Sequence, residues 1–230
     1  MAKNARRGVH VIRVCIVCEG ATEVEFVKSC LTPHLLKYNV NAYPTILQSA
    51  SGRHRGGRVK VERLAHFISH EYHVTNRLTT LLDFYGFQDA GDRTRLELEQ
   101  AILAAAQKIT TGFDSRFIRP YVQMHEFEGL LFSDVEQFQL VLDGWNTEVH
   151  NTLIDIRSEF STPEDINNSR DTAPSKRILK AFPEGSYNKT EHGPLIAEAI
   201  GLTLIRDQCP QFDDWMRMLE SWGRADDQNQ

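Results

Sequence analysis

The chain has 230 residues, of which 41% are hydrophobic and 25% are charged, and its formal net charge is −5. This size and composition suit one large α/β domain, or one domain with a small appendage, and the acidic balance argues against a protein that coats nucleic acid with its whole surface. The chain has no apolar run of the roughly 20 residues that span a bilayer, and its basic N-terminus lacks the apolar segment of a signal peptide, so we expect a cytoplasmic protein without membrane contact.

The first half of the chain alternates between strand and helix patterns. Pro33 is expected to limit or kink the first helix, and Pro120 predicts an edge position or an irregularity in the fourth strand. Strict alternation predicts an α/β fold in which a mainly parallel, four-stranded sheet is flanked by helices. The expected strands are 11–18, 42–47, 77–84 and 116–124, and the expected helices are 23–38, 62–76 and 94–108.

The second half has mainly helical patterns. Ser133 and Glu136 predict a capping box before a helix, and Thr162 with Pro163 predicts another helix start. Further helices are expected at 147–160 and at 212–222, and in the second of these Trp215 and Trp222 would face a core or an interface. Between them, one helix is expected to begin at Pro174 and another to end at Gly201. We therefore divide the chain into a core of alternating strands and helices, 1–132, and a mainly helical extension, 133–230, packed on that core.

Two patterns that often bind metal are interpreted as structural here. Cys15 and Cys18 form a C-x-x-C pair, but residues three apart on a strand point to opposite faces, so both are expected to be buried apolar side chains. His66 and His70 have the i, i+4 spacing of zinc ligands without an H-E-x-x-H motif, and we expect them on an exposed polar face.

Carboxylates follow three of the predicted strands. Glu19 follows the first strand, Asp83 ends the third, and Glu126 and Glu128 follow the fourth, while Glu23 lies in the first turn of the next helix. The carboxyl ends of parallel strands share one edge of a sheet, so these acids are expected to converge. Clustered carboxylates repel each other, and a hard divalent cation such as Mg²⁺, Mn²⁺ or Ca²⁺ removes that cost. The alternative is that the acids cap helices and face water.

Basic side chains are candidates for binding phosphate. Arg58 and Lys60 belong to a glycine-rich basic loop, and Lys176 and Arg177 lie in the first turn of the helix that Pro174 opens. Cations are unfavourable at a helix N-terminus, which suggests a functional reason for the second pair. Lys189 follows later in the chain. The alternative is a set of solvated basic residues.

These residues support a resemblance to a known fold. Glu19-Gly20 after a buried strand and Asp83-Phe84-Tyr85 after a later strand resemble the two motifs of the Toprim fold, which occurs in topoisomerases, primases and nucleases of the overcoming-lysogenization-defect type. The chain more closely resembles an uncharacterised bacterial family of Toprim-like proteins, DUF4276. The resemblance covers almost the whole chain and rests on the stretches CEGATEVEF, GGRVK, TLLDFYGF, YVQMHEFEGLLFSD, PEDIN, TAPSKRI, SYNKTEHG and CPQFDDWMRMLESW.

The resemblance implies roles for several residues. Glu19 and Asp83 would bind a divalent metal, Glu23 would be the acid of the first helix, and Lys176 would be the catalytic lysine. Tyr85 stands where Toprim enzymes have the second acid of D-x-D, and a protonated phenol is a poor Mg²⁺ ligand. One possibility is that Glu126 or Glu128 supplies the missing carboxylate ligand. The other is that the metal site binds more weakly or has changed its purpose. The resemblance also implies an ABC-type ATPase partner and a role in antiviral defence.

The leading hypothesis is a Mg²⁺- or Mn²⁺-dependent nuclease that acts on DNA or RNA. Glu23 would be a second-metal ligand or a general base, and Lys176, with Arg58 or Arg177, would stabilise developing charge. A second hypothesis is a non-catalytic Toprim-like module that binds or senses while docked on the ATPase. A third is another phosphoryl-transfer enzyme, such as a nucleotidyltransferase or a phosphatase for a small substrate.

Overall fold

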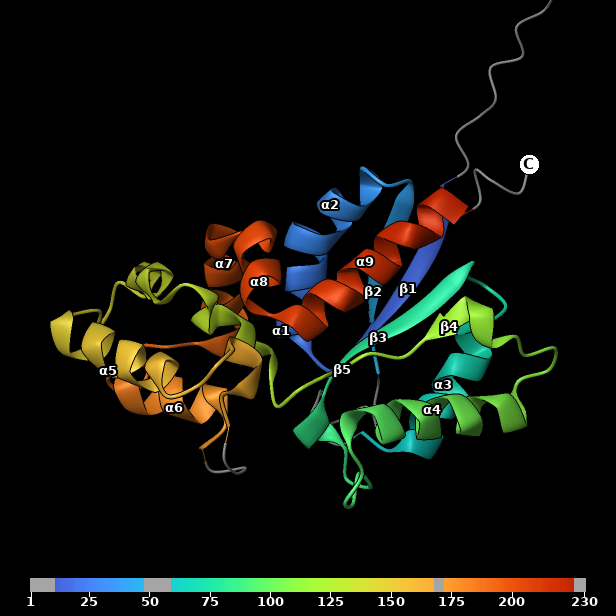
Figure 1. Cartoon of the computed structure of the whole chain (residues 1–230), viewed down its shortest axis with the longest axis horizontal. Helices are drawn as coiled ribbons and strands as arrows, with labels where there is room; N and C mark the ends of the chain where they lie inside the picture. Colours follow the sequence, from blue (N-terminus) through green and yellow to red (C-terminus); the bar gives the residue numbers. More distant parts are fainter. Residues whose placement is uncertain (1–10, 48–58, 168–171, 226–230) are drawn as a thin grey trace, which may run out of the picture.

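A parallel β-sheet lies at the centre of the computed structural model, which describes residues 11–47, 59–167 and 172–225 (Figure 1). Its strand order is β2-β1-β3-β4, and a fifth short strand, β5, also pairs with β3. Every pairing among them is parallel, which confirms the α/β prediction. The strands are β1 (Ile12–Cys18), β2 (Val40–Ile46), β3 (Arg77–Asp83), β4 (Ile118–Arg119) and β5 (Val122–Gln123).

β1 is the inner strand between β2 and β3, and both of its faces are covered. Cys15 and Cys18 belong to different hydrophobic clusters on opposite faces of the sheet, as the strand spacing predicts. Both are buried, unpaired in any disulfide, and burial raises the pKa of the Cys15 thiol to about 12. Protonated, enclosed thiols of this kind pack as small apolar side chains.

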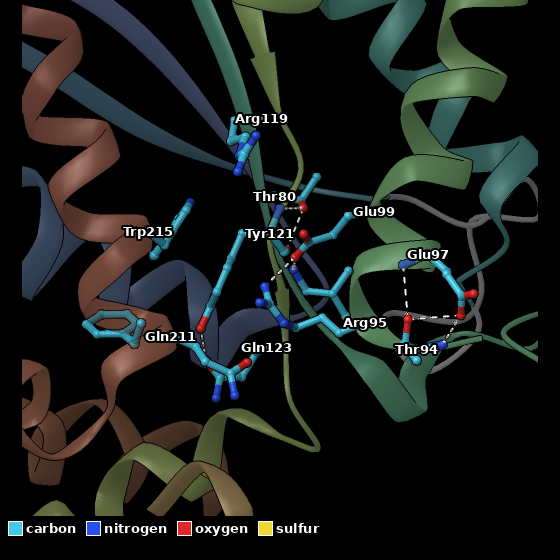
Figure 2. A network of polar contacts seen from close by, with 12 residues as sticks. Thr80, Thr94, Arg95, Glu97, Glu99, Arg119, Tyr121, Gln123, Gln211 and Trp215 are labelled. Atoms are coloured by element: carbon cyan, nitrogen blue, oxygen red, sulfur yellow. Dashed lines mark hydrogen bonds and ion pairs between the residues drawn. The ribbon is translucent and has the colours of Figure 1, made fainter. Parts of the chain in front are cut away.

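The predicted fourth strand is divided at Pro120 into β4 and β5. The hydroxyl of Thr80 replaces the missing ladder contacts here: its Oγ1 donates to the carbonyl of Tyr121 at 2.7 Å and accepts the Tyr121 N–H at 2.9 Å (Figure 2). The buried carboxylate of Glu99 accepts the Val122 N–H at 3.1 Å and pairs with Arg95 at 2.8 Å. Side chains therefore hold the edge of the sheet where proline interrupts it.

Helices cover both faces of the sheet (Figure 1). On one face, α1 (Ala21–Phe26), a π-helical turn (Val27–Leu31) and α2 (Thr32–Leu36) form a continuous helical segment in the larger hydrophobic cluster. α7 (Lys189–Ile200), α8 (Leu202–Gln208) and α9 (Pro210–Ala225) contribute to the same cluster. The opposite face carries α3 (Val61–Glu71) and α4 (Arg95–Ile109).

Two further helices, α5 (Thr147–Ser158) and α6 (Pro174–Ala181), pack side by side at one end of the molecule, away from the sheet (Figure 1). Pro174 opens α6 and Gly201, at φ 79°, closes α7, as expected. Trp215 and Trp222 are buried in the core, and His66 and His70 are exposed, which confirms both interpretations. The division at residue 132 stays a prediction.

Several local predictions were wrong. Helix α1 begins at Ala21, with Gly20 at its N-cap, and not at residue 23 as expected. Asp134, not Ser133, is the cap after the fourth strand, because its Oδ1 accepts the Glu136 N–H at 3.1 Å. The segments predicted as helices after Ser133 and from Thr162 form 3₁₀ turns rather than α-helices. The 3₁₀ turns are η2 (Phe84–Gly86), η3 (Ser115–Phe117), η4 (Phe127–Ser133), η5 (Val135–Leu140) and η6 (Pro163–Asp165).

No helix in the described part of the chain is both long enough and apolar enough to cross a membrane.

Candidate acidic site at the sheet edge

Five carboxylates lie together at the carboxyl edge of the sheet. Burial raises the pKa of Asp83 well above its ordinary value, and the surrounding charges raise it further. Those charges belong to Glu23, Glu19, Glu128 and Glu126. The parallel register explains the convergence, because Asp83 at the end of β3 is paired with Gln123 in β5, just before Glu126. The structure thus brings together all the acids that the sequence placed at strand ends.

The first helix holds Glu23 beside the strand end. Its Oε2 accepts the N–H of Gly20 at 2.9 Å, and burial, together with the charge of Glu19, raises its pKa. Glu19 in turn lies against Gly86 in η2: a Cβ at Gly86 would overlap Glu19 Oε2 and would lie 2.9 Å from its Cδ. Glycine is therefore needed at 86 for η2 to pass this close to the Glu19 carboxylate.

Two other acids accept hydrogen bonds from backbone N–H groups. Asp83 Oδ1 accepts the N–H of Phe127 at 3.0 Å, and Glu126 Oε2 accepts the N–H of Ser175 at 2.9 Å. Phe127 begins η4 and Ser175 lies in the first turn of α6. The carboxylates therefore fix the positions of the connection after β5 and of α6, which belongs to the predicted helical extension.

A lysine from α7 enters this acidic cluster. Lys189 Nζ lies 3.1 Å from Oε1 of Glu128, whose side chain is only 4% exposed. Burial raises the pKa of Glu128 to about 6, against the opposing effect of the lysine. Burial alone would lower the pKa of Lys189, but the charges of Glu128 and Glu126 outweigh it and raise the pKa. The ammonium group thus stays charged and offsets part of the repulsion among the carboxylates.

The donor set fits a hard divalent cation, because all five side chains offer carboxylate oxygens. Within residues 11–47, 59–167 and 172–225, however, no three His, Cys, Asp or Glu side chains stand close enough to hold a metal ion. Oxygens of Glu23, Asp83 and Glu126 are directed instead to backbone N–H groups, and an oxygen of Glu128 is directed to Lys189. Binding a cation would require side-chain rotation, which the present hydrogen bonds oppose.

The other predicted basic residues lie outside the cluster or are held elsewhere. Lys176 is exposed on α6, and its side chain forms no ion pair within the described part of the chain. Arg177 Nε donates to the carbonyl of Thr172 at 2.8 Å, and its guanidinium lies 3.7 Å from Glu159. Lys60 is exposed at the N-cap of α3. Arg58 lies outside the described residues.

Two aromatic side chains next to the acids were not identified from the sequence as a pair. The ring of Tyr85 stacks on that of His125, with centroids 5.6 Å apart and an interplanar angle of 21°. His125 has a φ of 68°, and Asn167 Nδ2 donates to its Nδ1 at 3.1 Å. Burial lowers the pKa of His125. The only sequence signal was position, since these residues come two after Asp83 and one before Glu126.

Comparison with models of protein families gives a match to a domain of unknown function, DUF4276, over residues 18–220. The match includes the five acids, Tyr85, His125 and Lys189. No curated protein and no solved structure matches the chain.

Proposed function

We propose that this chain, which belongs to the DUF4276 family, is a divalent-metal-dependent nuclease that hydrolyses phosphodiester bonds in DNA or RNA. The observation that carries the proposal is the convergence of five carboxylates, from the end of β1, α1, β3 and the connection after β5, beside Lys189. Without a cation to offset it, such a cluster destabilises the fold through repulsion and desolvation, so its presence favours a functional role.

Each residue has a role in the proposed reaction. Glu19, Asp83 and one of Glu126 and Glu128 would hold Mg²⁺ or Mn²⁺, which when bound would acidify water and stabilise charge on a phosphate. Glu23 would be a ligand of a second metal ion or a general base, and as the base it would accept a proton from the attacking water. The water oxygen forms a bond to phosphorus, the bond from phosphorus to the leaving oxygen breaks, and that oxygen takes a proton from solvent.

Lys189 is better placed than Lys176 to stabilise negative charge on the phosphate. Its ammonium already lies among the acids, whereas Lys176 is exposed on α6. Ammonium groups bind phosphate oxygens through charge-assisted hydrogen bonds. Lys60, Lys176 and Arg58 remain candidates for contacts with more distant phosphates, and Arg177 is engaged by Thr172 and Glu159.

The biological setting is part of the proposal. The resemblance of Glu19-Gly20 and Asp83-Phe84-Tyr85 to Toprim motifs supports a nuclease like those of the overcoming-lysogenization-defect type. On the same basis we propose that the chain works in antiviral defence in the cytoplasm with an ABC-type ATPase.

A non-catalytic module is the second candidate, and one observation favours it. Lys189 already pairs with Glu128, and in the part of the chain that the structure describes no three side chains form a metal-binding group. In this second candidate function, Lys189 permanently takes the place of the metal ion. The chain would then act as a binding or sensor module of its ATPase partner. Retained ATPase binding without Mg²⁺ or Mn²⁺ binding at millimolar concentration would favour this candidate.

The test of the nuclease is cleavage of plasmid, single-stranded DNA and transfer RNA with Mn²⁺. The wild-type protein is compared with Glu19→Gln and Asp83→Asn, which keep the size of each side chain and remove its charge. We expect Mn²⁺-dependent cleavage by the wild type and strong loss in both variants. Cleavage that persists at the wild-type rate in both variants would rule out the assignment.

A further inference from the structure

The pair formed by His125 and Tyr85 has no role in the proposed reaction so far. Tyr85 stands at the position of the second D-x-D acid, and its ring stacks on His125 instead of offering a carboxylate. Both residues are partly exposed. They come from the segments that follow β3 and β5, so they lie at the same edge of the sheet as the acids.

The backbone at His125 has a costly conformation. Its φ of 68° is in the left-handed region, which among the described residues other than glycine occurs elsewhere only at Asn39. Residues with a Cβ adopt this region at a cost in free energy, and such residues are concentrated where function requires a particular side-chain direction. At His125 this conformation accompanies a ring that stacks on Tyr85 and accepts a hydrogen bond from Asn167.

Contacts on two sides fix the ring and its proton. Tyr85 covers one face of the imidazole, and Asn167 Nδ2 donates to Nδ1 at 3.1 Å. An amide NH₂ can only donate, so Nδ1 accepts and the proton of the neutral ring is on Nε2. Within the described part of the chain, Nε2 has no hydrogen-bond partner.

We infer that His125 contacts the substrate of the proposed nuclease, with its Nε2–H donating a hydrogen bond to a phosphate oxygen, and that Tyr85 and Asn167 position its ring. The inference rests on the proposed function. It also accounts for the missing acid, because position 85 then supports a donor for the substrate instead of a metal. A fixed N–H donor suits a site whose five carboxylates would otherwise repel the phosphate.

The test compares Mn²⁺-dependent cleavage of an oligonucleotide by four single variants and by the double variant of His125→Asn with Tyr85→Ala, together with Mn²⁺ affinity and thermal stability. His125→Asn fits the left-handed backbone but shortens the side chain, and Tyr85→Ala removes the stacked ring. Tyr85→Phe keeps the ring, so its kcat is expected to fall less than that of Tyr85→Ala. His73→Asn is the matched control: this exposed histidine also contacts a tyrosine ring, that of Tyr72, but it precedes the opposite end of β3.

We expect His125→Asn to lower kcat by about 10²-fold, as loss of one preorganised donor does, with Mn²⁺ affinity and thermal stability unchanged. Tyr85→Ala should lower kcat similarly, and the double variant should lose little more, because both changes remove the same contact. His73→Asn should keep the wild-type rate.

Wild-type kcat in His125→Asn would overturn this inference and leave the proposed function intact. Loss of Mn²⁺ binding in His125→Asn to the extent seen in Glu19→Gln would also overturn it, because His125 would then be a metal ligand. If the wild-type protein neither binds Mn²⁺ nor cleaves any substrate, the proposed function fails and this inference fails with it.

Discussion

Lys189 Nζ lies 3.1 Å from Oε1 of Glu128, and the charges of Glu126 and Asp83 act on the same ammonium group. The lysine comes from the first residue of α7, and Glu128 comes from η4. This ion pair links the segment after the sheet to the C-terminal helices, and its positive charge offsets part of the repulsion among the carboxylates. Its removal should therefore affect both stability and activity.

Replacement of Lys189 by Met should lower the free energy of unfolding by about 1–3 kcal/mol, the cost of leaving a buried group without its partner. Urea unfolding in the absence of divalent cations measures this loss. Adding Glu128→Gln to Lys189→Met should recover part of it, because the remaining group is then neutral. If the double variant is less stable than Lys189→Met, repulsion at Glu128 is not the cause of the loss.

The same lysine should be more important than Lys176 for cleavage. Lys189→Met should lower kcat by about 10²-fold through loss of charge stabilisation, while Lys176→Met should change it little. Both variants remove one ammonium group from the N-terminal turn of a short helix, so each is a control for the other. Steady-state cleavage with Mn²⁺ measures the difference. A larger loss in Lys176→Met would restore the assignment made from the resemblance.

The sequence predicted the sheet and the strand-end acids because both depend on local patterns. Apolar runs that end in Glu19 and Asp83 identify strands and the edge where they stop, and parallel pairing then brings the acids together. The partners of these acids could not be predicted. Lys189 reaches Glu128 only through the packing of α7. Tyr85 stacks on His125, whose backbone has a φ of 68°, and no residue pattern indicated either feature. Contacts between distant segments depend on tertiary packing, which local patterns do not contain.

Gly86 should be more important for cation binding than for folding. A Cβ at this position would overlap the Glu19 carboxylate, whose flexible end would move away. Gly86→Ala should therefore weaken Mn²⁺ binding by about tenfold or more, as displacement of supporting groups does at metal sites, with a small change in stability.

Gly20→Ala is the matched control for Gly86→Ala. A Cβ at Gly20 would lie 3.4 Å from Glu23 Oε2, an ordinary contact, and the N–H that Glu23 accepts is retained. Isothermal titration with Mn²⁺ compares the two variants. Equal affinities would show that the approach of η2 to Glu19 has no influence on the cation.

The buried carboxylate of Glu99 should stabilise the edge of the sheet. Glu99→Ala leaves the Val122 N–H and the Arg95 guanidinium without their acceptor (Figure 2), which should cost about 1–3 kcal/mol. Hydrogen exchange at the Val122 amide should accelerate more than at amides of β1. Gln100→Ala, an exposed neighbour on α4, serves as the control and should leave both measurements unchanged. Protection of Val122 that survives in Glu99→Ala would contradict this role.

Acid should unfold the protein partly through the charged network that joins α8 and α9. Burial alone would raise the pKa of Glu220, but hydrogen bonds from His34 and Arg206 outweigh it and lower the pKa below its ordinary 4.5. Burial alone would also raise the pKa of Asp213, but hydrogen bonds from Arg206 and Arg217 outweigh it and lower the pKa below 3.8. A carboxyl group with a lowered pKa in the folded protein binds protons more tightly in the unfolded chain. The stability that this network contributes is therefore fully present above the ordinary pKa values, and it is lost as the pH falls through the lower folded-state pKa values.

Glu220→Gln should therefore flatten the decrease in the free energy of unfolding below the ordinary pKa of 4.5. Urea unfolding at a series of acidic pH values measures the slope. Asp214→Asn removes an exposed carboxylate from the same helix and should leave the steep part of the curve in place. The prediction is contradicted if Glu220→Gln loses stability with falling pH as steeply as the wild type, because the protons taken up on unfolding would then bind to other groups.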